Sequence, residues 1–181
     1  TRLNRYALDG RLLASFEIPE SLSRQDQLTR VGNRLLLKLG RSISSLPLDA
    51  APGTKAERLD LDADVMSSSA YGGRVVLFDR TAGELFWFEP AAHSRTPLVQ
   101  IEDAVTSVHV GDDGTVFVFG GSQVRAWKDG QAVPGFPKDF RGERPQKIGD
   151  HWFSHSWHGT VNRMNDRFEP DPGVVLGGAS G

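Results

Sequence analysis

Short apolar runs alternate with turns along the whole chain. At four points a turn containing glycine, asparagine or aspartate is followed, after one polar residue, by two to four apolar residues, and a second apolar segment comes about ten positions later. The four turns are Gly32-Asn33, Gly72-Gly73, Asp113-Gly114 and Gly149-Asp150, and the apolar runs after them are 35–37, 75–78, 116–119 and 152–153. Such runs bounded by turns predict antiparallel strands, and no segment keeps a helical period over ten residues.

The turns recur at a spacing of about forty residues. A repeat of this length in a chain made of strands is the signature of β-propeller blades, each of which is a four-stranded antiparallel sheet. We therefore predict an all-β fold, a single partial β-propeller over residues 1–181. The expected blades are 26–64, 65–104, 105–143 and 144–181, with the outer strands only of a further blade in 1–20.

The first residues predict a hairpin that belongs to an unfinished blade. Asp9-Gly10 stands between two apolar segments, and this dipeptide is a strong hairpin signal because both central residues of a type I′ turn need positive φ. We expect residues 1–18 to be the outer two strands of a blade without its inner pair, so the chain would form an incomplete arc of about four and a half blades. The expected partners then include the missing propeller blades or an additional domain of the same full-length protein. A closed wheel of four or five blades is the alternative.

One blade resembles known propeller families. The segment from Gly73 through the strand that ends at Asp79, followed by an aromatic strand, is similar to the repeat of NHL-type propellers and of the related YVTN and quinoprotein-like propellers. Asp79, Gly83 and Trp87 also fall at the spacing of the quinoprotein docking motif, although Ala82 stands where that motif has threonine. The resemblance implies a β-propeller and leaves the family unresolved.

Composition excludes several classes of function. The chain has 181 residues, of which 38% are apolar and 24% charged, and a formal net charge of −2. Its basic residues are scattered among the turns, so there is no basic stripe for a nucleic-acid backbone. No apolar run approaches the ~20 residues that cross a bilayer, so we predict no membrane span. Cysteine is absent, which excludes disulfides and thiol chemistry.

The segment 151–158 is the candidate ligand-binding site. His151, His155 and His158 lie within eight residues and are interleaved with Trp152 and Trp157. Zinc favours histidine, but no acidic residue is placed to complete a metal shell, so we predict no metal site. Indoles and imidazoles also offer stacking faces and hydrogen-bonding groups of the kind that small aromatic and sugar ligands use. The alternative is that these side chains pack between blades or fill a turn.

The acidic groups are expected to be structural. Asp112-Asp113 and Glu102-Asp103 fall at turns or between strands, where aspartate caps turns and keeps the surface polar. The same role is expected for Asp60, Asp62 and Asp64, although a connection between blades could also hold a cation. No order of residues typical of a nucleophilic triad and no phosphate-binding glycine loop is present.

The function predicted from these features is a non-catalytic binding or interaction module. Its loops would be presented to a protein, a glycan or a small-molecule ligand, and no motif identifies a cofactor. The alternative is a propeller enzyme of the lactonase, lyase or glycosidase kind, with a site at the channel mouth. Its candidate residues are Asp64, Glu102, His109 and His155.

Overall fold

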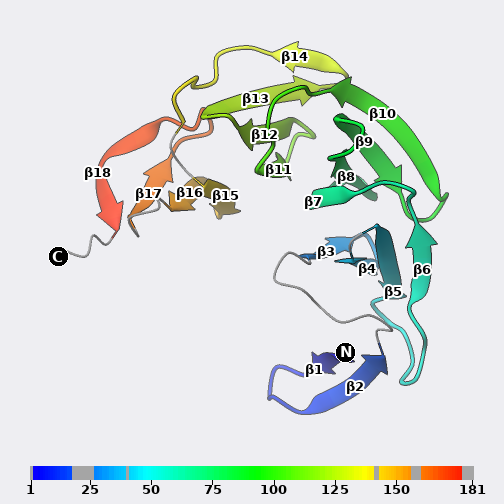
Figure 1. The fold of residues 1–181 in the computed structure, drawn as a ribbon. Helices are drawn as coiled ribbons and strands as arrows, with labels where there is room; N and C mark the ends of the chain where they lie inside the picture. The colour runs from blue at the N-terminus through cyan, green and yellow to red at the C-terminus, as the bar shows by residue number, and fades with distance from the viewer. Residues whose placement is uncertain (1, 18–26, 40, 141–142, 156–159, 177–181) are drawn as a thin grey trace. The chain divides into compact units, whose positions relative to one another are not determined.

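The computed structural model describes residues 2–17, 27–39, 41–140, 143–155 and 160–176. These residues form eighteen strands and no helix (Figure 1). The described residues therefore include no helix that could span a membrane. The strands belong to two compact units, Thr1–Gln100 and Ile101–Gly181, which we describe separately.

The first unit contains three antiparallel sheets. A two-stranded sheet pairs β1 (Arg2–Tyr6) with β2 (Leu12–Glu17). The next sheet has the order β3 (Gln27–Val31), β4 (Arg34–Leu39), β5 (Ser42–Pro47) and β6 (Glu57–Asp60). The third has the order β7 (Val65–Tyr71), β8 (Arg74–Asp79), β9 (Glu84–Glu89) and β10 (Ser94–Gln100).

The second unit contains two further four-stranded antiparallel sheets. One has the order β11 (Ser107–Val110), β12 (Val116–Gly120), β13 (Gln123–Lys128) and β14 (Gln131–Val133). The other has the order β15 (Glu143–Ile148), β16 (His151–His155), β17 (Val161–Met164) and β18 (Pro170–Leu176). The four four-stranded sheets confirm the predicted all-β fold with four-stranded antiparallel blades. The assignment of the first hairpin to an unfinished blade stays a prediction.

Tight turns join consecutive strands within each sheet. Gly72 and Gly73 connect β7 to β8 with φ angles of 58° and 79°, which is the left-handed backbone that a two-residue hairpin requires. One edge strand contains a proline. β10 carries Pro97 at a register shift on the edge of its sheet, where a missing N–H is tolerated.

The sheets of the first unit are joined by alternating apolar side chains. Val75 and Leu77 on β8 lie opposite Phe88 and Phe86 on β9, so all four point to one face of the sheet. They are buried in one cluster with apolar residues of the preceding sheet, among them Ile43. Burial of side chains of this size stabilises the fold by about 1.5–3 kcal/mol each.

The core of the second unit is aromatic. Its buried cluster is Phe117, Phe119, Val124, Ala126, Phe140, Trp152, Met164 and Phe168. The aromatic runs of β9 in the first unit and of β12 in the second are both core, because Phe86, Trp87, Phe117 and Phe119 are at most 8% exposed.

Candidate functional site

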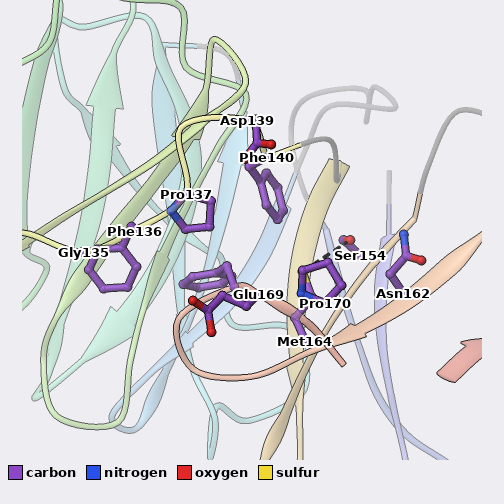
Figure 2. Close-up of a pocket in the computed structure, with 11 residues that line it drawn as sticks. Gly135, Phe136, Pro137, Asp139, Phe140, Ser154, Asn162, Met164, Glu169 and Pro170 are labelled. Carbon is purple, nitrogen blue, oxygen red and sulfur yellow. Dashed lines mark hydrogen bonds between the residues drawn. The ribbon is translucent and has the colours of Figure 1, made fainter. Parts of the chain in front are cut away.

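The second unit contains a pocket of about 580 Å³ (Figure 2). One wall is the loop that follows β14, which contributes Gly135, Phe136, Pro137, Asp139 and Phe140. The rest of the lining comes from β16, β17, β18 and the turn before β18, with Ser154, Asn162, Met164, Phe168, Glu169 and Pro170. In Figure 2 the loop residues Pro137 and Phe140 lie on one side of the pocket, and Ser154 and Pro170 lie on the other.

The loop wall is held in place by the backbone of β13 and its preceding turn. The N–H of Val124 donates to the carbonyl of Pro137 at 3.0 Å, and the N–H of Phe140 donates to the carbonyl of Ser122 at 2.8 Å. Phe140 is therefore anchored in the core at 8% exposure, while Phe136 remains half-buried at the pocket surface. These two bonds fix an aromatic wall that would otherwise be an irregular loop.

The opposite wall is shaped by the turn between β17 and β18, which Asn165 organises. Its side-chain oxygen accepts the backbone N–H groups of Arg167 and Glu169, at 2.9 and 3.1 Å. Its Nδ2 donates to Glu169 Oε2 at 2.9 Å. Phe168 completes the turn with a φ of 60°, a left-handed backbone that is rare for a bulky residue. The turn thus buries the Phe168 ring and holds the Glu169 carboxylate at the pocket rim.

Three buried side chains form the floor of the pocket. Ser154, Met164 and Phe168 are 4%, 2% and 1% exposed. The Ser154 hydroxyl donates to the Met164 sulfur, with Oγ and Sδ 3.7 Å apart, and a thioether is a weak acceptor. The oxygen of Ser154 can therefore still accept a hydrogen bond from a donor in the pocket.

An aromatic cluster supports the floor from behind. The Phe168 ring centroid lies 4.7 Å from that of Trp152 and 5.1 Å from that of Phe117. Trp152 donates from Nε1 to Asp166 Oδ1 at 3.2 Å, so its buried polar atom is satisfied. His109 meets the Trp152 ring edge-on at 5.8 Å, and burial lowers the pKa of this imidazole from 6.5 to about 4. The pocket thus stands on a packed aromatic cluster, and the lowered pKa keeps His109 neutral at pH 7.

The polar groups of the pocket are mainly acceptors. Two exposed carboxylates, Asp139 and Glu169, come from opposite walls, and Asn162 on β17 adds one amide. Within the described part of the chain, the lining contains no lysine, arginine or histidine. The pocket therefore combines aromatic and proline surfaces with negative charge.

The histidine and tryptophan segment lies on one strand of this pocket, but largely on its other face. His151 and His155 on β16 are exposed, whereas Trp152 and Ser154 alternate with them and are buried. Trp152 packs in the cluster behind the pocket and does not line it. Trp157 and His158 lie outside the described residues. Ligand binding by this segment stays a prediction.

The acidic residues between β6 and β7 and at the end of β6 all form ion pairs. Asp60 pairs with Arg58 at 2.9 Å, Asp62 with Arg41 at 3.3 Å and Asp64 with Arg80 at 2.9 Å. Among the residues that the structure describes, no group of three histidine, aspartate or glutamate side chains could hold a metal ion.

The acidic groups of the second unit are in turns and ion pairs as well. Asp113 accepts the backbone N–H of Thr115 and a hydrogen bond from Lys128, and these bonds lower the pKa of Asp113 to about 2. Asp103 pairs with Arg125 at 2.8 Å, and Glu102 beside it is exposed.

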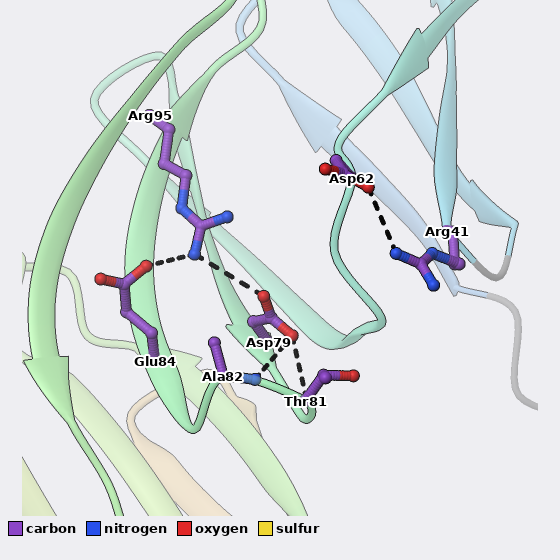
Figure 3. Close-up of polar contacts among 7 residues, drawn as sticks. All are labelled: Arg41, Asp62, Asp79, Thr81, Ala82, Glu84 and Arg95. Carbon is purple, nitrogen blue, oxygen red and sulfur yellow. Dashed lines mark hydrogen bonds and ion pairs between the residues drawn. The ribbon is translucent and has the colours of Figure 1, made fainter.

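Asp79, the acidic residue of the docking-motif resemblance, caps the turn between β8 and β9 (Figure 3). Its Oδ1 accepts the backbone N–H groups of Thr81 and Ala82, at 3.0 and 3.2 Å. Arg95 forms ion pairs with Glu84 and with the other oxygen of Asp79, and its guanidinium carbon lies 3.9 Å from the Phe86 ring centroid. All these groups are occupied with one another, so they indicate a structural role in the blade.

Sequence reasoning missed the residues that line the pocket. Phe136 and Phe140 stand in a segment rich in glycine and proline, and Phe168 stands in a turn that is otherwise polar. Large aromatic residues in such connections are the signal that could have found them, because a surface loop has no need of them.

Comparison with known proteins supports the fold and leaves the family open. No protein-family model matches the chain, and no curated protein matches it. Among solved structures, Hsv2 of Kluyveromyces lactis, a propeller protein, is 13% identical with a TM-score of 0.63, over 93% of this chain and 56% of that one. The propeller-containing nidogen/laminin complex is 11% identical with a TM-score of 0.61, over 82% of this chain and 62% of that one.

A computationally designed protein, Ika4, is also similar. It is 14% identical with a TM-score of 0.58, over 83% of this chain and 96% of the designed one. This chain spans less than two thirds of the length of the Hsv2 and nidogen/laminin chains. Sequence identities this low support a common fold and nothing beyond it. The chain has a β-propeller fold built of four-stranded antiparallel blades.

Proposed function

We propose that this chain is a non-catalytic binding module and that the pocket between the loop after β14 and the turn before β18 is its ligand site. The observation that carries the proposal is the pocket itself: about 580 Å³, walled by Phe136, Phe140 and two prolines, with a few polar groups. Small-molecule sites have this volume and this mixture of apolar walls and sparse polar groups. The anchored loop and the Asn165 turn make the walls largely preformed, which lowers the entropic cost of binding.

The candidate family remains the NHL, YVTN and quinoprotein-like group of propellers. Its support is the segment from Gly73 to Asp79 and the turn that Asp79 caps before the buried Trp87. A protein partner fits such a module too, since one structural neighbour is named for a complex of nidogen with laminin.

The alternative function is a propeller enzyme. Two carboxylates, Asp139 and Glu169, reach the same pocket, and paired carboxylates can perform general acid and base chemistry. If the chain is such an enzyme, the wild type should turn over a lactone or glycoside, and both D139N and E169Q should lose this activity. If it is a binding module, the wild type should show no turnover.

A neutral apolar probe tests the binding proposal. We expect 2-phenylethanol to shift the backbone NMR signals of the loop after β14 and of the turn at Asn165, in the millimolar range. The variant Asn162→Phe places an aromatic side chain in the pocket and should abolish these shifts. Gln146→Phe makes a similar amide-to-aromatic change at an exposed position of β15 and should leave them unchanged.

The same titration separates the pocket from the histidine segment. His151→Ala and His155→Ala change exposed side chains on the other face of β16, so pocket binding predicts unaltered shifts in both. If the histidine variants no longer bind 2-phenylethanol while Asn162→Phe still does, the ligand site is the histidine segment and the pocket proposal is wrong.

A further inference from the structure

We propose that the ligand of this pocket is an organic ammonium ion, a positively charged amine carried on an apolar body. The inference rests on the proposed function, because it names the chemical class that the same pocket would select.

The charge of the lining is the first support. Asp139 comes from the loop wall and Glu169 from the turn wall, so the two carboxylates approach the pocket from different elements. Among the residues that the structure describes, no lysine, arginine or histidine lines the pocket to neutralise them. A cation gains attraction from both carboxylates, whereas an anion is repelled by both.

The second support is that one of these carboxylates is positioned in advance. Asn165 Nδ2 donates to Glu169 Oε2 at 2.9 Å, while the Asn165 oxygen accepts the Glu169 backbone N–H at 3.1 Å. Both ends of Glu169 are therefore held by one side chain. An ionised carboxylate has more lone pairs than this single donor uses, so it can still accept an ammonium N–H.

The floor adds an acceptor of the same kind. Ser154 is 4% exposed, and its proton is directed to the weak acceptor Met164 Sδ at 3.7 Å. Its oxygen remains able to accept a hydrogen bond, and an ammonium group carries three donors. A ligand that supplies donors and no acceptors therefore matches the polar groups of the pocket best.

Aromatic walls complete the selection. Phe136 is half-buried at the pocket surface, and Phe140 also belongs to the lining. The faces of aromatic rings attract cations through their quadrupole and also accept an apolar body. The volume of about 580 Å³ leaves room for such a body next to the ammonium group.

Three probes that share one body test the charge preference: 2-phenylethylammonium, 2-phenylethanol and 3-phenylpropionate. Because both carboxylates are exposed, we expect each to contribute modestly, and the cation to bind about fivefold to tenfold more tightly than the alcohol at low salt. The anion should bind most weakly. The preference for the cation should shrink as salt is added, since screening weakens exposed charge pairs.

Variants then assign the preference to named residues. Glu169→Gln and Asp139→Asn keep the size of each side chain and should each reduce binding of the cation severalfold while leaving the alcohol unchanged. Asp150→Asn removes an exposed carboxylate from the turn between β15 and β16, outside the lining, and should change neither.

A peptide could supply the same chemistry through a lysine side chain. A blocked Phe-Lys dipeptide amide is therefore compared with the norleucine analogue, which lacks the charge. If only the phenyl probes show a preference for the charged member, the ligand is a free amine. If only the peptide pair shows it, the ligand is a lysine side chain. Either result supports the ammonium inference.

Two outcomes overturn the inference, and they differ. If the alcohol binds as tightly as the ammonium ion and Glu169→Gln has no effect, the ammonium inference fails while the binding proposal survives. If none of the probes binds, both fail together.

Discussion

The rings of Phe168 and Trp152 lie with their centroids 4.7 Å apart, and Phe168 reaches this position through a backbone φ of 60°. A left-handed backbone costs a bulky residue roughly 1–2 kcal/mol relative to glycine. The burial of the Phe168 ring at 1% exposure offsets this cost, because a packed aromatic side chain contributes about 3–5 kcal/mol. The floor of the pocket is therefore built on a locally unfavourable backbone that its own packing stabilises.

This balance predicts an unusual order of stabilities at position 168. Both Phe168→Ala and Phe168→Gly lose the ring, but only glycine relieves the left-handed backbone, so Phe168→Gly should be about 1 kcal/mol more stable than Phe168→Ala. Urea denaturation of the two variants measures the difference.

Phe119 provides the matched control for position 168. It is equally buried at 1% exposure but lies within β12 and has no positive φ. At position 119 the order of stabilities should be the reverse of that at position 168: Phe119→Gly should be less stable than Phe119→Ala by about 0.5–1 kcal/mol. The same order at both positions would show that the backbone of Phe168 carries no strain.

The strands could be predicted because their signals are local. Alternation and hairpin glycines specify each strand from a few neighbouring residues, as at Gly72-Gly73, where the turn and the register of β8 follow from the sequence. The local signal is weaker at a sheet edge that contains proline, because proline removes a backbone donor and the register shifts, as at Pro97.

The pocket could not be predicted because its walls are irregular segments placed by tertiary contacts. The loop wall depends on the bond from Phe140 N–H to the Ser122 carbonyl, and the turn wall depends on a positive φ at Phe168, which no residue preference indicates. The sequence directed attention to β16, where His151 and His155 are conspicuous, but alternation along the strand turns Ser154 rather than the histidines toward the pocket.

Gly120 at the end of β12 is expected to be intolerant of a side chain. A Cβ at this position would lie 1.9 Å from the Ala104 carbonyl oxygen and 3.0 Å from Val105 Cα, and both are backbone atoms. Gly120→Ala must displace that segment and should cost about 2–3 kcal/mol of unfolding free energy. A Cβ on the adjacent Gly121 meets nothing within 4 Å, so Gly121→Ala should cost only about 1–2 kcal/mol, from its φ of 58°. Equal denaturation midpoints for the two variants would contradict the close approach of the backbones.

His109 should make the stability of the second unit depend on pH. Burial against Phe119 and Trp152 lowers its pKa from 6.5 to about 4. Between these two values the unfolded chain binds more protons than the folded one, so stability must rise with pH from about 4 to about 6.5 and level off above. The contribution of this residue over that window is on the order of 3 kcal/mol as an upper figure, since one pKa unit corresponds to about 1.4 kcal/mol.

Other groups titrate in the same window, so the difference between two proteins is the informative measurement. His109→Phe keeps a ring in the cluster and removes the titration, and the wild-type free energy of unfolding minus that of the variant should rise between pH 4 and 7. His151→Gln removes an exposed histidine and should reproduce the wild-type slope. NMR titration of the His109 ring in the folded protein gives a second readout, in which the ring should stay neutral down to about pH 4. A ring that protonates near pH 6.5, or a variant that keeps the full slope, would mean that His109 is open to solvent and that the support behind the pocket is looser than its packing indicates.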